Sequence, residues 1–447
     1  MKRMCALSLV ALCPIAIATL RAQQPPQATE LPSDPFSIKN TWIIGGTGPW
    51  DYLTMDSGAE RLYIAHGHAV QVVDVKTGTL AGAIADLVDA HAVALDDTGE
   101  FVYVSDGRGG KVIVFDRRTL QTVATIEDVP SPRALVFEPQ TRLLFAVRID
   151  QISAPRPAAV PRTTTHITPR PAPAPQPSPK PNTGSSITII DTQTRKVVGR
   201  IVVPEVLGFA LADGKGNIFV NVTDRNRILQ FDAQTVAALL PKRPDGTAVG
   251  SAAPTVTAAP EPDPAHSSAS GPNSASPVAG ASKTVTPPFT IDWTEGGRQV
   301  RSFSLDGQCV APKSLAIDSA HVRLFAACGN LKLLVLNADN GNLIATLPIG
   351  SDVDAIGYDS KNGLIFSANG GADGNLTIIR QDVTDSYAVV QNLPTRQRAR
   401  TLAVNPDTGQ VYLVTDLLGM DLSRPGGIGT LQTDTVNGSF QVLVVGH

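Results

Sequence analysis

Cysteine and aromatic residues are both scarce in this chain of 447 residues. Only 4 cysteines occur, and aromatic residues make up 5% of the sequence. Two of the cysteines, Cys5 and Cys13, lie in the first 22 residues. The chain is therefore not a small disulfide-rich scaffold, and 42% hydrophobic residues can form a large core instead. The Cys-x-x-Cys-His haem motif and the Gly-x-Ser-x-Gly nucleophile elbow are both missing, and we expect no cofactor.

Excess positive charge is also missing. The formal net charge is −3, and without the first 22 residues 34 basic face 40 acidic residues, which gives −6. A mildly acidic chain has no electrostatic reason to bind nucleic acid. We expect the partner to be a small molecule or a protein.

Long apolar runs are confined to the N-terminus. Lys2 and Arg3 precede a mostly apolar run from Met4 to Leu20, and small residues follow near Ala22. This pattern predicts a signal peptide over 1–22, followed by a flexible leader over 23–36. The alternative is an N-terminal membrane anchor, because the run approaches the ~20 residues that span a bilayer. After cleavage no membrane span remains, and we expect a periplasmic or secreted protein.

Residues 88–129 contain four short apolar runs of period two, separated by turn residues. The runs are AVAL (92–95), FVYVS (101–105), KVIVF (111–115) and TVATI (122–126). Such runs, bounded by Gly and Asp, predict a four-stranded antiparallel meander. One meander cannot bury both of its faces, so it needs similar neighbours.

The same pattern recurs along the chain. An acidic residue ends each first strand, and an aromatic residue follows seven positions later, as in Asp96 and Tyr103. The repeat occurs seven times, with Asn405 replacing the acid in the last copy and a spacing one residue shorter after Asp213. The seven anchors are Asp56, Asp96, Glu138, Asp213, Asp318, Asp359 and Asn405. A period near 40 built from short strands predicts an all-β, seven-bladed β-propeller.

The two ends of the chain complete one blade. The last copy runs into the C-terminus after 440–445 and has no fourth strand, whereas 39–45 resembles a fourth strand without the first three. Pairing these two segments closes the ring and removes an open sheet edge. We expect a single, monomeric propeller over 37–447.

Two low-complexity insertions interrupt the repeats. Residues 151–184 are Pro-rich and carry four bases and no acid, and residues 241–290 are rich in Ala, Pro and Ser. Neither can form a core, so both are predicted to be disordered. They are either partner-binding arms or tolerated loop expansions. A shorter insertion, 417–438, interrupts the seventh blade.

The second strands include LYIAH (62–66), VYVSD (102–106), LFAVR (144–148) and VYLVT (411–415). Together with third strands that end in Asp before a Thr-Gly turn, they resemble the YVTN-type β-propeller repeat family, the YncE-like extracytoplasmic proteins. The resemblance covers about 39–447 apart from the insertions. It implies a propeller fold and no particular shared activity.

The start of each first strand lies near the mouth of the central channel in a propeller. Six of the seven residues five positions before the anchors are polar or ionisable, in front of apolar strands. We predict that they form a ligand-binding ring of mixed charge, which suits a zwitterionic or peptide-like ligand. The ring residues are Asp51, His91, Arg133, Gly208, Lys313, Asp354 and Arg400. The alternative is that residues in turns before strands are simply polar.

Two further sites are considered on the same face. His66, His68, His91 and Asp106 have the chemistry of a Zn²⁺ or Cu²⁺ site, but their spacing does not establish convergence, and we predict no metal site. Cys309 and Cys328 flank one hairpin and are the two cysteines left after signal cleavage. We predict a disulfide between them, with free thiols or a metal pair as alternatives.

Three functions are compatible with these residues. The first, which we favour, is an extracytoplasmic binding or scaffold protein without a catalytic residue. The second is a lactonase-like or other propeller hydrolase, with His91, Asp51 and Asp354 as candidates. The third is an envelope interaction protein that acts through the Pro-rich arms.

Overall fold

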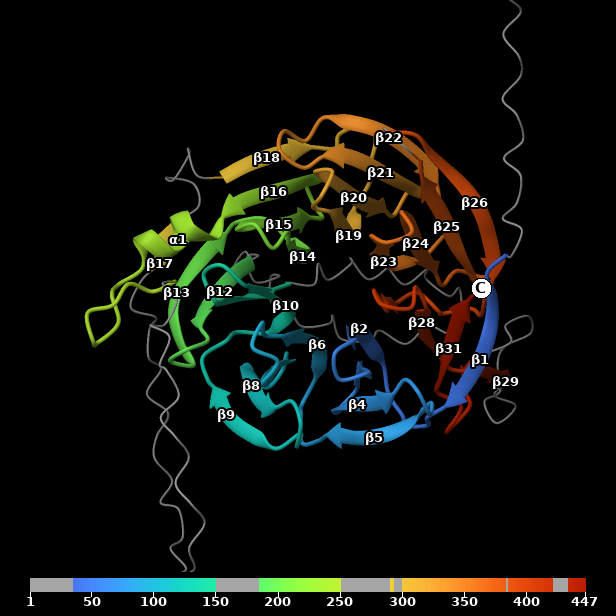
Figure 1. The fold of residues 1–447 in the computed structure, drawn as a ribbon, viewed down its shortest axis with the longest axis horizontal. Coiled ribbons are helices and arrows are strands. Elements are labelled where there is room, and N and C mark those ends of the chain that lie inside the picture. The colour runs from blue at the N-terminus through green and yellow to red at the C-terminus, as the bar shows by residue number, and fades with distance from the viewer. Residues whose placement is uncertain (1–34, 150–184, 251–289, 293–299, 383–384, 421–432) are drawn as a thin grey trace, which may run out of the picture.

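Seven antiparallel sheets form a closed ring around a central channel (Figure 1). The computed structural model describes residues 35–149, 185–250, 290–292, 300–382, 385–420 and 433–447. The ring confirms the predicted seven-bladed β-propeller. The predicted signal peptide, most of the leader, the insertion at 151–184 and most of the insertion at 241–290 lie outside the described residues.

Each blade places its first strand at the channel and its fourth strand at the rim. Blade one consists of β2 (Trp50–Asp56), β3 (Arg61–His66), β4 (Ala69–Asp74) and β5 (Thr79–Ile84). Blade two consists of β6 (Ala90–Leu95), β7 (Phe101–Asp106), β8 (Lys111–Asp116) and β9 (Thr122–Ile126). Blade three consists of β10 (Pro132–Glu138), β11 (Leu143–Arg148), β12 (Ser185–Asp191) and β13 (Lys196–Val203), and β17 (Thr290–Asp292) adds to its edge in parallel.

The remaining blades follow the same order. Blade four consists of β14 (Leu207–Ala212), β15 (Asn217–Val222), β16 (Arg227–Asp232) and β18 (Val300–Ser304). Blade five consists of β19 (Pro312–Asp318), β20 (Arg323–Cys328), β21 (Lys332–Asn337) and β22 (Leu343–Pro348). Blade six consists of β23 (Val353–Asp359), β24 (Leu364–Asn369), β25 (Asn375–Gln381) and β26 (Tyr387–Pro394).

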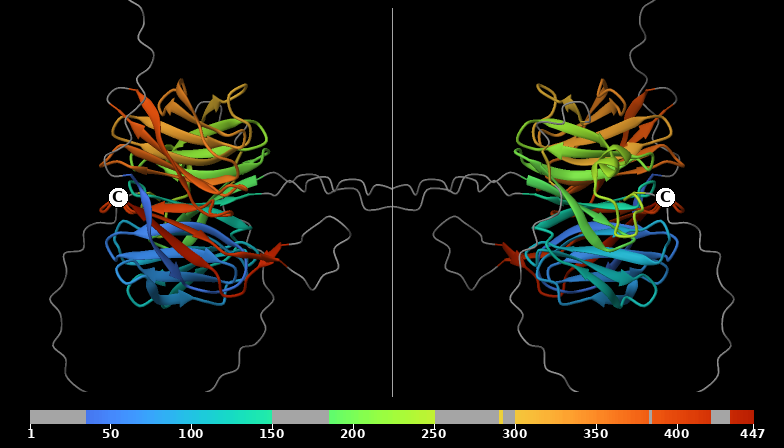
Figure 2. Two further views of the ribbon diagram at one scale, coloured as in Figure 1. Left: turned by 90° about the vertical axis from the view of Figure 1, so that its right-hand side faces the viewer. Right: turned by 90° about the vertical axis from the view of Figure 1, so that its left-hand side faces the viewer.

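Blade seven is built from both ends of the chain. It contains β27 (Leu402–Val404), β28 (Val411–Thr415), β31 (Gln441–Gly446) and β1 (Ser37–Ile43). Strands β1 and β31 are antiparallel, with Ser37 opposite Gly446. Figure 2 shows the blue β1 beside the red β31 when the ring is seen edge-on. The predicted closure is confirmed, although β1 begins at Ser37 rather than Lys39 and Phe36, which we assigned to the leader, is buried.

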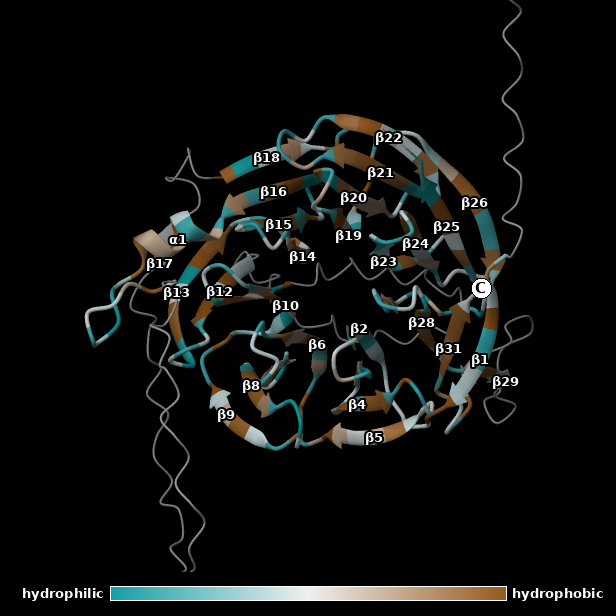
Figure 3. Ribbon diagram, viewed as in Figure 1, coloured by the Kyte–Doolittle hydropathy of each residue, from teal (hydrophilic) through white to brown (hydrophobic). Residues whose placement is uncertain are grey.

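The repeated aromatic residue is the centre of each blade's packing. All seven copies are at most 1% exposed: Tyr63, Tyr103, Phe145, Phe219, Phe325, Phe366 and Tyr412. Both faces of a blade are covered, one by each of its two neighbours, so the middle strands are apolar at nearly every position rather than at every second one. Figure 3 shows this pattern in β21 and β31, which are brown along most of their length.

The repeated acidic residue caps the hairpin that follows the first strand. The Asp96 carboxylate accepts hydrogen bonds from the backbone N–H groups of Gly99 (3.0 Å) and Phe101 (3.3 Å). The Glu138 carboxylate accepts from the N–H (2.7 Å) and hydroxyl (2.7 Å) of Thr141 in the same way. The spacing of the repeat is therefore the separation in sequence between the acidic residue that caps the turn and the buried aromatic residue of the second strand.

A short helix follows the third strand of blade four. The Asp232 carboxylate accepts a hydrogen bond from the backbone N–H of Thr235, which starts α1 (Ala233–Leu239). Beyond it, Val249 is buried, and Arg243 forms an ion pair with Asp191 of blade three (Nε to Oδ2, 2.7 Å). We assigned 241–250 to the disordered insertion, but this part packs against the propeller. In the part of the chain that the structure describes, no helix has the length and apolarity to cross a membrane.

A two-stranded hairpin extends blade seven. Strands β29 (Leu418–Met420) and β30 (Thr433–Thr435) pair antiparallel within the segment predicted as the shorter insertion.

Candidate ligand-binding site

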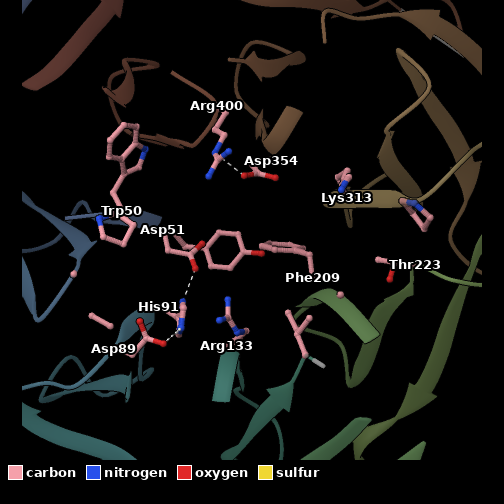
Figure 4. A pocket seen from close by; sticks show the side chains of 17 residues that line it. Trp50, Asp51, Asp89, His91, Arg133, Phe209, Thr223, Lys313, Asp354 and Arg400 are labelled. Carbon is pink, nitrogen blue, oxygen red and sulfur yellow. Dashed lines mark hydrogen bonds and ion pairs between the residues drawn. The ribbon is translucent and has the colours of Figure 1, made fainter. Parts of the chain in front are cut away.

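All seven predicted ring residues line one cavity at a mouth of the central channel. The cavity has a volume of about 520 Å³ and receives one of these residues from each blade (Figure 4). The cavity is also lined by residues that the sequence analysis did not select, among them Trp50, Tyr52, Asp89, Phe209 and Thr223. The structure therefore brings the whole predicted ring together.

β-Bulges position the ring residues. The pairing of the first and second strands shifts register between Pro132 and Ala134, so Arg133 has no partner in the ladder. A shift occurs at the corresponding place in five other blades and leaves out Asp51, His91, Gly208, Lys313 and Asp354, together with the next residue in blades one, two and four. A bulge bends the strand and redirects the side chain of the extra residue. This explains why polar side chains reach the channel from strands that are otherwise packed.

His91 connects two carboxylates at one side of the cavity. Its Nδ1 lies 2.6 Å from Asp51 Oδ2, and its Nε2 lies 3.0 Å from Asp89 Oδ2. The His91 residue is only 6% exposed. Carboxylate oxygens can only accept, so the imidazole donates at both contacts only when both of its nitrogens carry a proton. Arg108 also contacts Asp89, with Nε 3.3 Å from Oδ2.

Asp354 and Arg400 form the second charged pair. Arg400 Nε lies 2.8 Å from Asp354 Oδ2. Burial raises the pKa of the Asp354 carboxyl above its ordinary value, Arg400 opposes this shift, and the nearby Asp51 and Asp352 add to it. The carboxylate form of Asp354 is therefore held less favourably than in water.

Arg133 and Lys313 are the remaining cations of the ring. Within the described residues, neither side chain makes a hydrogen bond or an ion pair with a carboxylate. They belong to blades three and five, on either side of blade four, which contributes Gly208. A Cβ atom at Gly208 would lie 2.9 Å from Thr223 Cγ2, so a side chain at this position would require Thr223 to shift.

Two aromatic rings separate this cavity from the rest of the channel. Tyr52 of blade one and Phe209 of blade four have ring centroids 5.3 Å apart. Both also line a second cavity of about 250 Å³ that is bordered by first-strand residues such as Val93, Ala134 and Ile356. Burial and the carboxylates of Asp51 and Asp354 raise the pKa of the Tyr52 phenol well above its ordinary value, although Arg133 lowers it. The Tyr52 side chain is therefore uncharged at neutral pH, and together with Phe209 it forms the floor of the cavity.

The histidines considered for a metal site have other contacts. His66 Nδ1 lies 2.8 Å from Gln71 Oε1, and its Nε2 lies 3.1 Å from the carbonyl oxygen of Gly48. His68 is exposed, and the Asp106 carboxylate accepts from the N–H groups of Val88 and Asp89. No group of three or more metal-binding side chains occurs in the parts of the chain that the structure describes.

Cys309 and Cys328 are joined by a disulfide in the structure. Both are buried, and the bond ties the segment before β19 to the end of β20. Lys313 follows this segment directly, so the disulfide restrains the blade-five side of the mouth.

The sequence analysis missed Tyr52 and Phe209 for one reason. In blades one, two and four the register shift spans two residues, so each bulge presents a second side chain, which is aromatic in blades one and four and Ala92 in blade two. Nothing in the spacing to the anchors distinguishes these blades from the others. An aromatic residue directly after a ring position is the only signal that the sequence contains.

Comparison with known proteins shows the fold. No protein-family model matches the sequence, and no curated protein matches it. Among solved structures, the chain is similar to RRP9 WD40 repeats (7% identity, TM-score 0.56, 92% of this chain and 97% of that chain). It is also similar to U3-55K (7%, 0.55, 91% and 98%) and to a chain of the mitotic checkpoint complex (13%, 0.53, 90% and 95%). At these identities the likeness establishes a β-propeller and nothing about the ligand.

Proposed function

We propose that this chain is an extracytoplasmic binding protein of the YVTN type that takes a ligand into the cavity at the channel mouth. The convergence of seven ring residues, one from each blade, in a single cavity carries this proposal. A volume of about 520 Å³ lies within the usual range for small-molecule sites, and charged groups of both signs lie above an aromatic floor. This arrangement suits a zwitterionic or peptide-like ligand better than a polyanion.

A hydrolase is the second candidate, because the contact between His91 and Asp51 resembles part of a general-base arrangement. A general base needs one ring nitrogen directed at a water or a nucleophile. Here Nε2 faces Asp89 at 3.0 Å, so both nitrogens of His91 are engaged. This geometry favours a positioning role. Hydrolysis of a lactone or aryl ester by the purified protein that is lost in His91→Gln would favour the hydrolase instead.

Export is part of the proposal and rests on the N-terminal sequence together with the disulfide between Cys309 and Cys328. Fractionation of expressing cells, followed by N-terminal sequencing of the mature protein, tests it. We expect the protein outside the cytoplasm, beginning after Ala22 or Ala18. An uncleaved protein in the membrane fraction would support the anchor instead.

The binding role is tested by blocking the cavity. Thr223 lines the mouth, whereas Lys361 is in the hairpin after β23, beyond the other end of that first strand. We would label Thr223→Cys and, as a control, Lys361→Cys with a bulky maleimide and screen mixed short peptides and amino acids by thermal shift. Stabilisation that persists in labelled Lys361→Cys and disappears in labelled Thr223→Cys is expected. No stabilising compound, or equal stabilisation in both, would contradict the proposal.

A further inference from the structure

Resting on the proposed binding role, we propose that the mouth cavity recognises a free carboxylate, held between Arg133 and Lys313 above the floor formed by Tyr52 and Phe209. The group belongs either to the C-terminus of a peptide or to a small amino-acid-like zwitterion. Both kinds of ligand present the same group to the cavity, a carboxylate bonded to a carbon that carries a side chain.

The distribution of partners within the cavity identifies the groups that are available to a ligand. The three carboxylates that line it, Asp51, Asp89 and Asp354, each contact a basic side chain of the protein. Arg133 and Lys313 line the same cavity and have no carboxylate partner among the described residues. Arg133 and Lys313 are therefore the cations of the lining that are available to form an ion pair with an anionic group of a ligand.

Blade four makes room for this anion. Gly208 contributes no side chain between Arg133 and Lys313, and Thr223 lies behind it. The Thr223 hydroxyl donates to the carbonyl oxygen of Val206 (3.2 Å), so towards a ligand it can accept a hydrogen bond but not donate one. In Figure 4, Phe209 projects into the cavity between the sides that carry Arg133 and Lys313. The anion is therefore bound by the two cations, beside an aromatic surface.

The other side of the cavity limits the charge of the ligand. The Arg and Lys side chains of the lining, Arg133, Lys313 and Arg400, equal its three carboxylates in number, so these groups give no large excess of positive charge. A phosphate or other polyanion in this volume would approach Asp51 and Asp354. A single carboxylate on a neutral or zwitterionic molecule avoids this repulsion. A ligand ammonium group can lie on the side of Asp354, whose pKa such a cation would lower.

The test compares peptides that differ only in the terminal group. Binding of the tripeptide Gly-Ala-Phe, its C-terminal amide, free phenylalanine and inorganic phosphate to the full mature protein would be measured by calorimetry. We expect the free acid to bind about tenfold or more tightly than the amide. Arg133→Ala and Lys313→Ala should each remove about tenfold of the affinity, and the double variant should no longer distinguish acid from amide. Binding of phenylalanine as tightly as the tripeptide assigns the zwitterion source, and tighter tripeptide binding assigns the peptide source.

Controls separate this inference from the proposed function. Arg133→Lys should restore most of the affinity, and Lys361→Ala, which removes a cation outside the mouth, should change nothing. Equal affinity for acid and amide, phosphate competition as strong as that of the peptide, or no binding of any of these probes would overturn the carboxylate site. The proposed function would still stand if the blocked Thr223→Cys protein lost stabilisation by other compounds of the screen.

Discussion

Tyr52 and Phe209 meet edge to face across the central channel, with centroids 5.3 Å apart and planes inclined by 63°. They come from blades one and four and divide the channel into an upper cavity with charged walls and a lower cavity with mostly apolar walls. The contact places a phenol beside the carboxylates of the ring. The ionisation of this phenol therefore reports on the charge of the site.

The phenol of Tyr52 should remain protonated well above the ordinary pKa of tyrosine. Replacing Asp354 with Asn removes one of the negative charges that raise this pKa, so the pKa of Tyr52 should fall but stay elevated, because burial is the largest cause. NMR titration of labelled tyrosine measures it, with Tyr52→Phe for assignment. Tyr103, whose pKa burial raises to about 12, should not respond. An unchanged pKa of Tyr52 in Asp354→Asn would show that the two groups are not coupled.

Asp354 should make stability depend on pH in mildly acidic solution. Its pKa is raised in the folded protein, mainly by burial, so the folded state holds the proton more tightly than the unfolded chain does. Wild-type stability should therefore fall as the pH rises from the ordinary aspartate pKa through the raised one. Asp354→Asn lacks this loss, and the stability of the variant relative to wild type should increase over the same interval. Urea unfolding at a series of pH values measures the difference, and a difference that does not vary with pH would contradict the raised pKa.

Loss of the disulfide should destabilise the protein. Cys309 and Cys328 are 19 positions apart, and cross-linking a loop of this size restricts the unfolded chain by about 3 kcal/mol. Denaturant unfolding should show a loss of this order in the Cys309→Ala, Cys328→Ala double variant. Reduced wild type should behave like the variant. Equal stability of oxidised and reduced wild type would show that the bond restrains only a local segment.

The buried ion pair between Arg243 and Asp191 should contribute more to the free energy of unfolding than a surface ion pair does. The side chains of Arg243 and Asp191 are 6% and 1% exposed, so Arg243→Ala leaves a buried carboxylate without its main partner. We expect a loss of about 3 kcal/mol, measured by urea unfolding, together with faster hydrogen exchange over 240–250. Lys242→Ala, at the exposed neighbouring position, is the matched control. Equal effects of the two variants would mean that packing of Val249, not the ion pair, holds the segment.

The ring could be predicted from the sequence because one distance is repeated. In blades one to six the ring residue lies in a bulge five positions before the acid that caps the hairpin, as in Arg133 and Glu138. Counting five positions back from the capping residues therefore identified the residues that line the channel mouth. The partners of the ring residues could not be found in this way. The contact of His91 with Asp51 depends on side-chain directions in two blades, and the spacing of the repeat does not contain them.

Other local features could not be predicted from the sequence for a different reason. Asp232 ends a third strand like its counterparts, but here its carboxylate caps α1 instead of a turn, since a helix-forming Ala-rich segment follows. The segment after it packs through Leu240 and Val249 and through the ion pair of Arg243 with Asp191 in another blade. Histidine is a common metal ligand, but the ring of His66 packs against Phe440, with centroids 3.9 Å apart, and forms a hydrogen bond with Gln71. For Arg243 and for His66, a contact with a residue distant in sequence contributes to the outcome.

The bulges separate the chemistry of this protein from its architecture. A residue such as Lys313 stands outside the strand ladder, so its side chain can change without disturbing the pairing of Pro312 or Ser314 on either side. The other bulged positions also lie outside the ladder, each in a different blade, although a side chain at Gly208 would require Thr223 to move. The mouth can therefore be re-specified one side chain at a time, by evolution or by design, while the closed ring that carries it stays the same.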